Sequence, residues 1–220
     1  PALLRIFLQI LLGFIIYLQF SDTSIIYLFF FIFLSLAIVN VTNFQDGLDL
    51  NIGSYIFQYI FFIYFYEYLG LVEVHSFIIL NLSIFLILFL YFNYKYKFFF
   101  GDSGCYIFSS LILIFLSNNN YFISILFFIN LFLFPIIDTS YVTIFRIFKN
   151  ENLLSRNFYH LYHKLHDQKK GYYYLIPPIL NNILLLPVMI YDINFYLKIL
   201  FAMIVTSSFY FIVRFSFINR

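Results

Sequence analysis

Long apolar segments alternate with short polar connections along the whole chain. Because a helix rises about 1.5 Å per residue, about 20 apolar residues cross the roughly 30 Å hydrocarbon layer of a bilayer. Eight segments come close to this length: 2–20, 25–42, 51–69, 76–94, 104–117, 121–137, 173–191 and 195–214. They lack the alternation of membrane barrel strands, and backbone in lipid must bond internally, so each segment is predicted to be a helix.

Basic residues divide the connections into two kinds. The connections 21–24, 67–75, 117–120 and 191–194 contain no Lys or Arg. Eleven of the twelve basic residues lie at the opposite helix ends, and Lys198 is the exception. The positive-inside rule places the basic ends in the cytoplasm. Segment 104–117 is short for a span, but without it the basic 138–172 loop would move outside and the asymmetry would be lost.

These patterns predict an all-α fold, a polytopic transmembrane helical bundle of about eight spans with a cytoplasmic amphipathic loop over 138–172. We expect one integral membrane domain over residues 1–220, because the sequence contains no repeat, low-complexity linker or second domain. Since residue 1 is Pro1 and begins an apolar segment directly, we also expect the chain to start partway through a longer protein.

Composition supports a membrane protein and excludes several other classes. The chain is 64% hydrophobic and 10% charged, with a mean hydropathy of +0.95, whereas soluble domains carry about 25% charged residues. A single cysteine, Cys105, excludes an internal disulfide and a cysteine-based zinc site. The many Phe and Tyr residues are consistent with an AT-rich coding bias, so we expect no nucleic-acid partner.

Two acidic clusters are predicted to lie on the cytoplasmic face, within residues 40–51 and 95–105. Asp46 and Asp49 are three residues apart and would share a face of a helical end. Asp102 follows a glycine in a turn that opens a helix, where a ligand can approach closely. Carboxylates gathered at a membrane edge repel one another unless a cation lies among them, and Mg²⁺ prefers such oxygen ligands together with phosphate and water.

The third polar cluster is the 138–172 loop. His160 and His163 are predicted on one face of a short amphipathic segment, and the nearby basic residues form an anion-attracting surface: Arg156, Lys164, Lys169 and Lys170. Carboxylates, a divalent ion and basic groups together indicate a phosphoryl-transfer site.

Each cluster taken alone also has a structural interpretation. The acidic residues could be solvated loop residues, the Gly-Asp turn an ordinary turn, and the basic loop a topology determinant. The two histidines could lie on an interfacial helix. Asn93 is interpreted as a hydrogen-bonding residue between helices and Cys105 as a small residue at a helix start.

Four stretches carry a family resemblance: "NVTNFQDGLDL" (40–50), "FFFGDSGC" (98–105), "FPIIDTSYVTIFRIFKNENLLSRNFYHLYHKL" (134–165) and "LLRIFLQILLGF" (3–14). In their order along the chain, these stretches resemble the motifs of the polyprenyl-phosphate N-acetylhexosamine-1-phosphate transferases of glycosyltransferase family 4. The resemblance covers the length of the chain. It implies a Mg²⁺-dependent phosphotransferase, with Mn²⁺ as an alternative ion.

The resemblance also implies residue roles. Catalytic roles would fall to Asp46, Asp49 and Asp102, and the metal ligands would be Asp102 and Asn43. Substrate would be bound by Asn40, Asn43, Arg146, His160 and His163, with the histidines on the donor diphosphate and Arg146 supporting their loop.

The implied reaction is attack by an oxygen of undecaprenyl phosphate on the sugar-linked phosphate of a UDP-N-acetylhexosamine, with release of UMP. It would initiate an O-antigen or capsule type polysaccharide. The expected location is the bacterial inner membrane, with the site facing the cytoplasm and membrane lipids around it. A homodimer is left open.

Several positions depart from the family pattern. An adjacent Asp-Asp pair, expected before the first helix, is absent, so this piece alone is expected to be inactive. Leu50 stands where the family has a second Gly, Cys105 where it has Ser, and Asn157 where a charged residue is usual; Tyr162 is typical of the O-antigen branch.

Three other functions remain as alternatives. A CDP-alcohol phosphotransferase would need an Ala-Arg pair and further Asp residues after Gly47, which are missing. A transporter or flippase of polyprenyl-linked sugars would carry charges near mid-membrane. A catalytically degenerate scaffold member of the family is the third.

Overall fold

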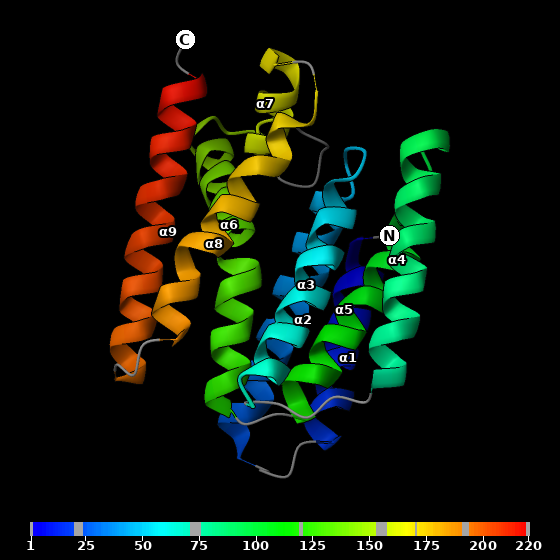
Figure 1. The fold of residues 1–220 in the computed structure, drawn as a ribbon. Coiled ribbons are helices and arrows are strands. Elements are labelled where there is room, and N and C mark those ends of the chain that lie inside the picture. Colours follow the sequence, from blue (N-terminus) through cyan, green and yellow to red (C-terminus); the bar gives the residue numbers. More distant parts are fainter. Residues whose placement is uncertain are drawn as a thin grey trace. The chain divides into compact units, whose positions relative to one another are not determined.

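The computed structural model describes residues 2–19, 24–70, 76–118, 121–152, 158–169, 171–190 and 194–218, which form helices and short connections with no strand. The helices are α1 (Ala2–Gln19), α2 (Ile25–Gln45), α3 (Asn51–Tyr68), α4 (Ser76–Tyr96), α5 (Gly101–Asn118), α6 (Tyr121–Phe148), α7 (Leu161–Lys169), the 3₁₀ turn η1 (Tyr172–Leu175), α8 (Ile176–Ile190) and α9 (Phe195–Ile218) (Figure 1). The all-α polytopic prediction is confirmed. Predictions on Pro1, Arg156, Asn157 and Lys170 lie outside the described residues.

Within the described residues, three helices are long and apolar enough to cross a membrane: Ile25–Gln45, Ile125–Phe148 and Phe195–Ser216. Shorter apolar helices cover Leu3–Leu18, Leu80–Tyr96, Gly101–Ser117 and Tyr172–Val188. Many large apolar side chains on their outer faces are exposed, for example Ile87, Ile204 and Phe201. A water-soluble surface rarely carries this much contiguous apolar area, so lipid is the solvent that matches it.

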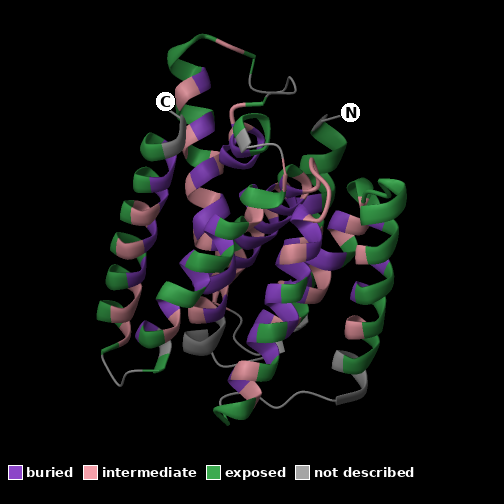
Figure 2. Cartoon of the chain, turned by 45° about the horizontal axis from the view of Figure 1, so that its top comes forward, coloured by how far each residue is buried: buried purple, intermediate pink, exposed green. Residues whose placement is uncertain are grey.

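The chain forms two compact units, residues 1–127 and 128–220. In the first unit α2 packs against α1, α3 and α5, and α3 also packs against α4. Gly13 permits the α1–α2 contact, because a Cβ there would lie 2.7 Å from the Cα of Ile32. Most residues of α3 are buried (Figure 2). Burial against protein accounts for the polar groups of α3, such as Gln58, which a lipid-facing helix would avoid.

In the second unit α9 packs against α7 and α8, and η1 joins α7 to α8. The predicted span 121–137 and loop from Asp138 need correction, because α6 continues to Phe148. Its 28 residues are about 42 Å long, longer than the roughly 30 Å hydrocarbon layer, so its last turns extend beyond the lipid core.

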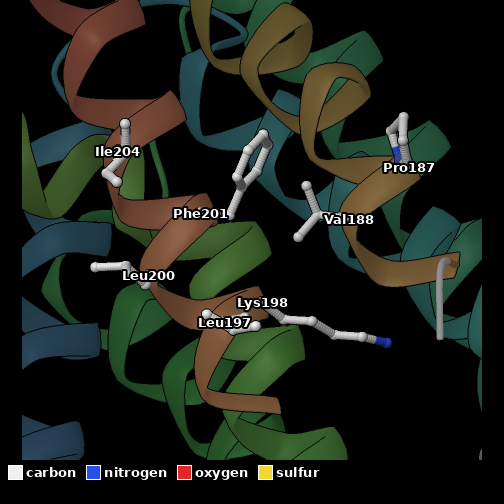
Figure 3. Close-up of a pocket in the computed structure, with 7 residues that line it drawn as sticks. All are labelled: Pro187, Val188, Leu197, Lys198, Leu200, Phe201 and Ile204. Carbon is white, nitrogen blue, oxygen red and sulfur yellow. The ribbon is translucent and has the colours of Figure 1, made fainter. Parts of the chain in front are cut away.

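An apolar groove of about 430 Å³ lies between α8 and α9, lined by Pro187, Val188, Leu197, Lys198, Leu200, Phe201 and Ile204 (Figure 3). The ammonium of Lys198 points away from the apolar side chains, and the groove offers no polar atom for chemistry.

The turn between α2 and α3 contains a backbone conformation that favours glycine. Leu50 has a φ of 60°, and the left-handed region costs an L-residue about 1–2 kcal/mol. This is the position at which the sequence departs from the second Gly of the family motif.

We predict that Leu50→Gly stabilises the protein by about 1 kcal/mol, because glycine adopts this conformation without the steric cost. The measurement is the thermal midpoint in detergent. Leu48→Gly is the matched control, since Leu48 lies in the same turn without a positive φ, and it should lower the midpoint. A lower midpoint in Leu50→Gly would contradict the prediction.

Candidate active site

Asp46 connects the turn after α2 to the start of α5. Its two carboxylate oxygens accept the backbone N–H groups of Phe100, at 3.0 Å, and Gly101, at 2.7 Å. The first N–H groups of a helix have no partner inside the helix, and a negative charge there is favourable. Asp46 therefore fixes the point at which α5 begins. The expected shared helical face of Asp46 and Asp49 is wrong, because α2 ends at Gln45 and both residues lie in the turn.

Asp102 lies in the first turn of α5, as predicted, and its carboxylate pairs with the Arg5 guanidinium at 2.5 Å. Both side chains are about half exposed, 48% and 54%, and such pairs contribute only about 0–1 kcal/mol. Arg5 is held at its backbone, where its carbonyl accepts the Tyr106 hydroxyl at 3.1 Å. The pair can thus open without disturbing the fold, which leaves Asp102 accessible to a cation and Arg5 accessible to an anion.

Asp49 pairs with Lys97 in the segment between α4 and α5. Asn93, fully buried in α4, joins the same two segments: its Oδ1 accepts the Leu50 N–H, and its Nδ2 donates to the Phe98 carbonyl at 2.8 Å. The interpretation of Asn93 as a hydrogen-bonding residue between elements is confirmed. The two acidic clusters predicted from the sequence therefore meet at one end of the first unit.

The amides of the first cluster have largely structural contacts. The side chains of Asn40 and Gln9 bind each other, with Asn40 Nδ2 donating to Gln9 Oε1 at 3.1 Å. Buried Asn51 donates to the carbonyl of Gln45 at 3.0 Å. Asn43 is half-buried in the last turn of α2. Its predicted role as a metal and substrate ligand, and that of Asn40 on substrate, stay predictions.

The pKa of Asp46 is raised above its ordinary value. Burial is the main cause, the N–H groups of Phe100 and Gly101 oppose it, and the charge of Asp102 adds to it. The folded protein therefore holds this proton more tightly than the unfolded chain does. The stability that comes from the protonated form is lost as the pH rises through the raised pKa.

The donor set suits a magnesium ion bound through few protein ligands. Among the described residues, no group of three or more His, Cys, Asp or Glu side chains is gathered for a metal. Mg²⁺ usually takes one or two carboxylates and completes its shell with water and substrate phosphates. The half-exposed Asp102 fits this mode of binding with few protein ligands, and its charge acts on nearby Asp46. Arg5 supplies the positive charge that balances Asp102.

The residues predicted on the donor diphosphate lie in the second unit. His160 directly precedes α7 and His163 lies in its first turn; that the two share one face of this short segment stays a prediction. Both imidazoles are buried, with 3% and 8% exposure, and His160 Nδ1 lies 2.8 Å from the carboxylate of Asp138. Arg146 donates to the Asn152 carbonyl in the chain segment after α6. This contact is consistent with its predicted role in supporting the loop.

Three residues with central contacts were not assigned a role from the sequence. Arg5 lies in the stretch 3–14 that carries the family resemblance but has no role assigned there. Tyr210 and Arg214 are not singled out, although both bind Asp138. The separation of 76 residues between Asp138 and Arg214 leaves no local signal.

We predict that Asp46→Asn loosens the start of α5, because a carboxamide offers one acceptor oxygen where two N–H groups need partners. Hydrogen–deuterium exchange at the Phe100 and Gly101 amides should become at least about tenfold faster, corresponding to about 1.4 kcal/mol. Asp49→Asn is the matched control and should leave these amides unchanged. Equal exchange in both variants would contradict the assignment.

The comparisons with known proteins give one positive result. The family model described as glycosyl transferase family 4 matches residues 2–120, more than half of the chain and nearly all of the first unit. A search of the curated proteins found no match, and neither did a search of the solved structures. The matched region contains Arg5, Asp46 and Asp102. The chain therefore belongs to glycosyl transferase family 4, a family of sugar-phosphate transferases, and is a membrane protein.

Proposed function

We propose that this protein transfers N-acetylhexosamine 1-phosphate from a UDP-sugar to undecaprenyl phosphate and releases UMP. The observation that carries the proposal is the meeting of Asp46, Asp102 and Arg5 at one end of apolar helices, in a chain of this family. The 21 residues of α2 rise about 31 Å, roughly one hydrocarbon thickness, so Asp46 would lie at the level of lipid phosphates.

This position suits both substrates. The polyprenyl chain would remain in lipid with its phosphate at the membrane edge, while the water-soluble nucleotide sugar arrives from the cytoplasm. In phosphoryl transfer, positioning and charge neutralisation supply most of the catalysis. Carboxylates that are fixed by the fold provide the positioning, and cationic side chains that can leave their ion pairs provide the charge neutralisation.

Each residue would have a distinct task. Asp102, together with Asn43 as the family resemblance implies, would hold Mg²⁺, which would neutralise charge on the transferred phosphate. Arg5, released from Asp102, would bind a phosphate oxygen, since its guanidinium forms two parallel hydrogen bonds to such groups. Asp46 would keep the first turn of α5 in place, so that Asp102 stays aligned.

The second unit would bind the donor diphosphate through His160, His163 and the adjacent cations. Its basic surface includes Lys149 and Lys164, whose ammonium groups lie over the ring of Tyr159. The distribution of basic residues supports a site that faces the cytoplasm, and a bacterial inner membrane is part of the proposal through the family resemblance. Initiation of an O-antigen or capsule polysaccharide remains part of the same proposal.

A transporter is the main competing function. Transporters place ionisable groups near the bilayer midplane. Among the described residues of the first unit, the acidic groups Asp46, Asp49 and Asp102 lie in connections or in a first helical turn. That distribution supports a site at the membrane edge instead.

We predict that Asp102→Asn in the full-length protein lowers Mg²⁺-dependent release of UMP by at least about 10²-fold, because a ligand to the ion and its charge are lost. The measurement is UMP release from a UDP-N-acetylhexosamine in the presence of undecaprenyl phosphate. Glu67→Gln is the control: Glu67 lies in the last turn of α3, far along the helix from this site, and turnover should be unchanged. Unchanged turnover in Asp102→Asn would favour the transporter or scaffold.

A further inference from the structure

Asp138 is the centre of a buried hydrogen-bond network in the second unit. Its Oδ2 lies 2.8 Å from His160 Nδ1. Its Oδ1 accepts three donors: the Leu161 backbone N–H at 3.0 Å, the Tyr210 hydroxyl at 2.9 Å and Arg214 Nη1 at 3.3 Å. Asp138 is only 2% exposed, so this carboxylate joins α6, the start of α7 and α9 away from water.

Arg214 is itself held from several sides. Its Nη1 donates to the Tyr210 hydroxyl at 2.7 Å and its Nη2 to the Tyr159 carbonyl at 3.0 Å. The guanidinium carbon lies 3.9 Å from the centre of the Tyr141 ring. The charges of Arg214 and Asp138 balance, so the network is neutral when the imidazole is neutral, which is the condition under which buried ions are tolerated.

The two oxygens of Asp138 have different tasks. An ionised carboxylate only accepts hydrogen bonds, so His160 must donate to Asp138 from Nδ1. On Oδ1, the Leu161 N–H is one of the unpaired groups at the start of α7. A nine-residue helix is marginal by itself, and an anion at its first turn stabilises it.

A contribution to fold stability would not by itself explain why the protein contains such a buried network. Replacing a buried ion pair by apolar residues of similar volume is often neutral or stabilising. The network also lies at a defined depth: Asp138 is 17 residues beyond the start of α6 and Arg214 is 19 beyond the start of α9. These separations correspond to about 26 and 28 Å, close to one hydrocarbon thickness, which is the level of a lipid phosphate.

We propose that Asp138 is the positioning residue of the segment that contains His160 and His163. It selects the Nδ1-protonated tautomer of His160 and fixes the start of α7. The proposal rests on the proposed function for its catalytic consequence, which is that the donor diphosphate binds the segment that Asp138 holds in place. Arg214 keeps the carboxylate oriented for this task.

The hydrogen bonds of Asp138 predict how Asp138→Asn changes the tautomer of His160. Three donors converge on Oδ1, so the carboxamide oxygen must occupy that position. The amide NH₂ then faces His160 Nδ1, which has to accept a hydrogen bond, and the ring proton moves to Nε2. Tyr210→Phe is the matched control, because it removes a donor to Oδ1 and leaves the contact of Oδ2 with His160 intact.

The experiment is solid-state NMR of the full-length protein labelled with ¹⁵N-histidine in bilayers, with the His160 signals identified by their loss in His160→Gln. We expect the Nδ1 proton in the unchanged protein and in Tyr210→Phe, and the Nε2 proton in Asp138→Asn. The turnover number should fall at least about 10²-fold in Asp138→Asn but less than about threefold in Tyr210→Phe, although both variants lose thermal stability.

Two results would overturn the proposal. One is a proton on Nε2 of His160 in the unchanged protein, a measurement that requires no variant to fold. The other is the same tautomer and turnover number in Asp138→Asn as in Tyr210→Phe. Absence of UMP release by the unchanged protein would overturn the proposed function instead, and the tautomer measurement would still decide the role of Asp138.

Discussion

Both units depend on one kind of interaction, in which a carboxylate from one element binds the first backbone amides of a helix. Asp46 does this at the start of α5, and Asp138 does it at the start of α7. Helix starts carry unpaired N–H groups and a partial positive charge. An internal anion satisfies them and fixes where the following segment begins.

This constraint links the fold to the chemistry. Because Asp46 fixes the first turn of α5, the adjacent Asp102 remains at the surface, paired with Arg5 in a contact that is cheap to open. Because Asp138 Oδ2 accepts a hydrogen bond from Nδ1 of His160, this imidazole is assigned one tautomer. In each unit a carboxylate binds the start of a helix and thereby positions a neighbouring polar group, Asp102 in the first unit and His160 in the second.

Hydropathy predicted most of the helices, because apolar segments of bilayer length have few alternatives in lipid. It failed at the end of α6, where the apolar pattern stops near Asp138 but the helix continues to Phe148. The types of side chain at the candidate site were also predicted from the sequence. Their partners were not, because Asp46 binds backbone amides 54 and 55 residues away, and Arg214 lies 76 residues from Asp138.

The central claim of the account is that the segments around Asp102 and His160 face the same side of the membrane. Single cysteines at the exposed positions Ser103 and Gln168, in a cysteine-free background, test it with a membrane-impermeant maleimide in intact cells. We expect that neither of these two cysteines reacts until the membrane is permeabilised, whereas a cysteine at Tyr68 reacts from outside. Reaction of one of the pair from outside and the other only after permeabilisation would contradict it.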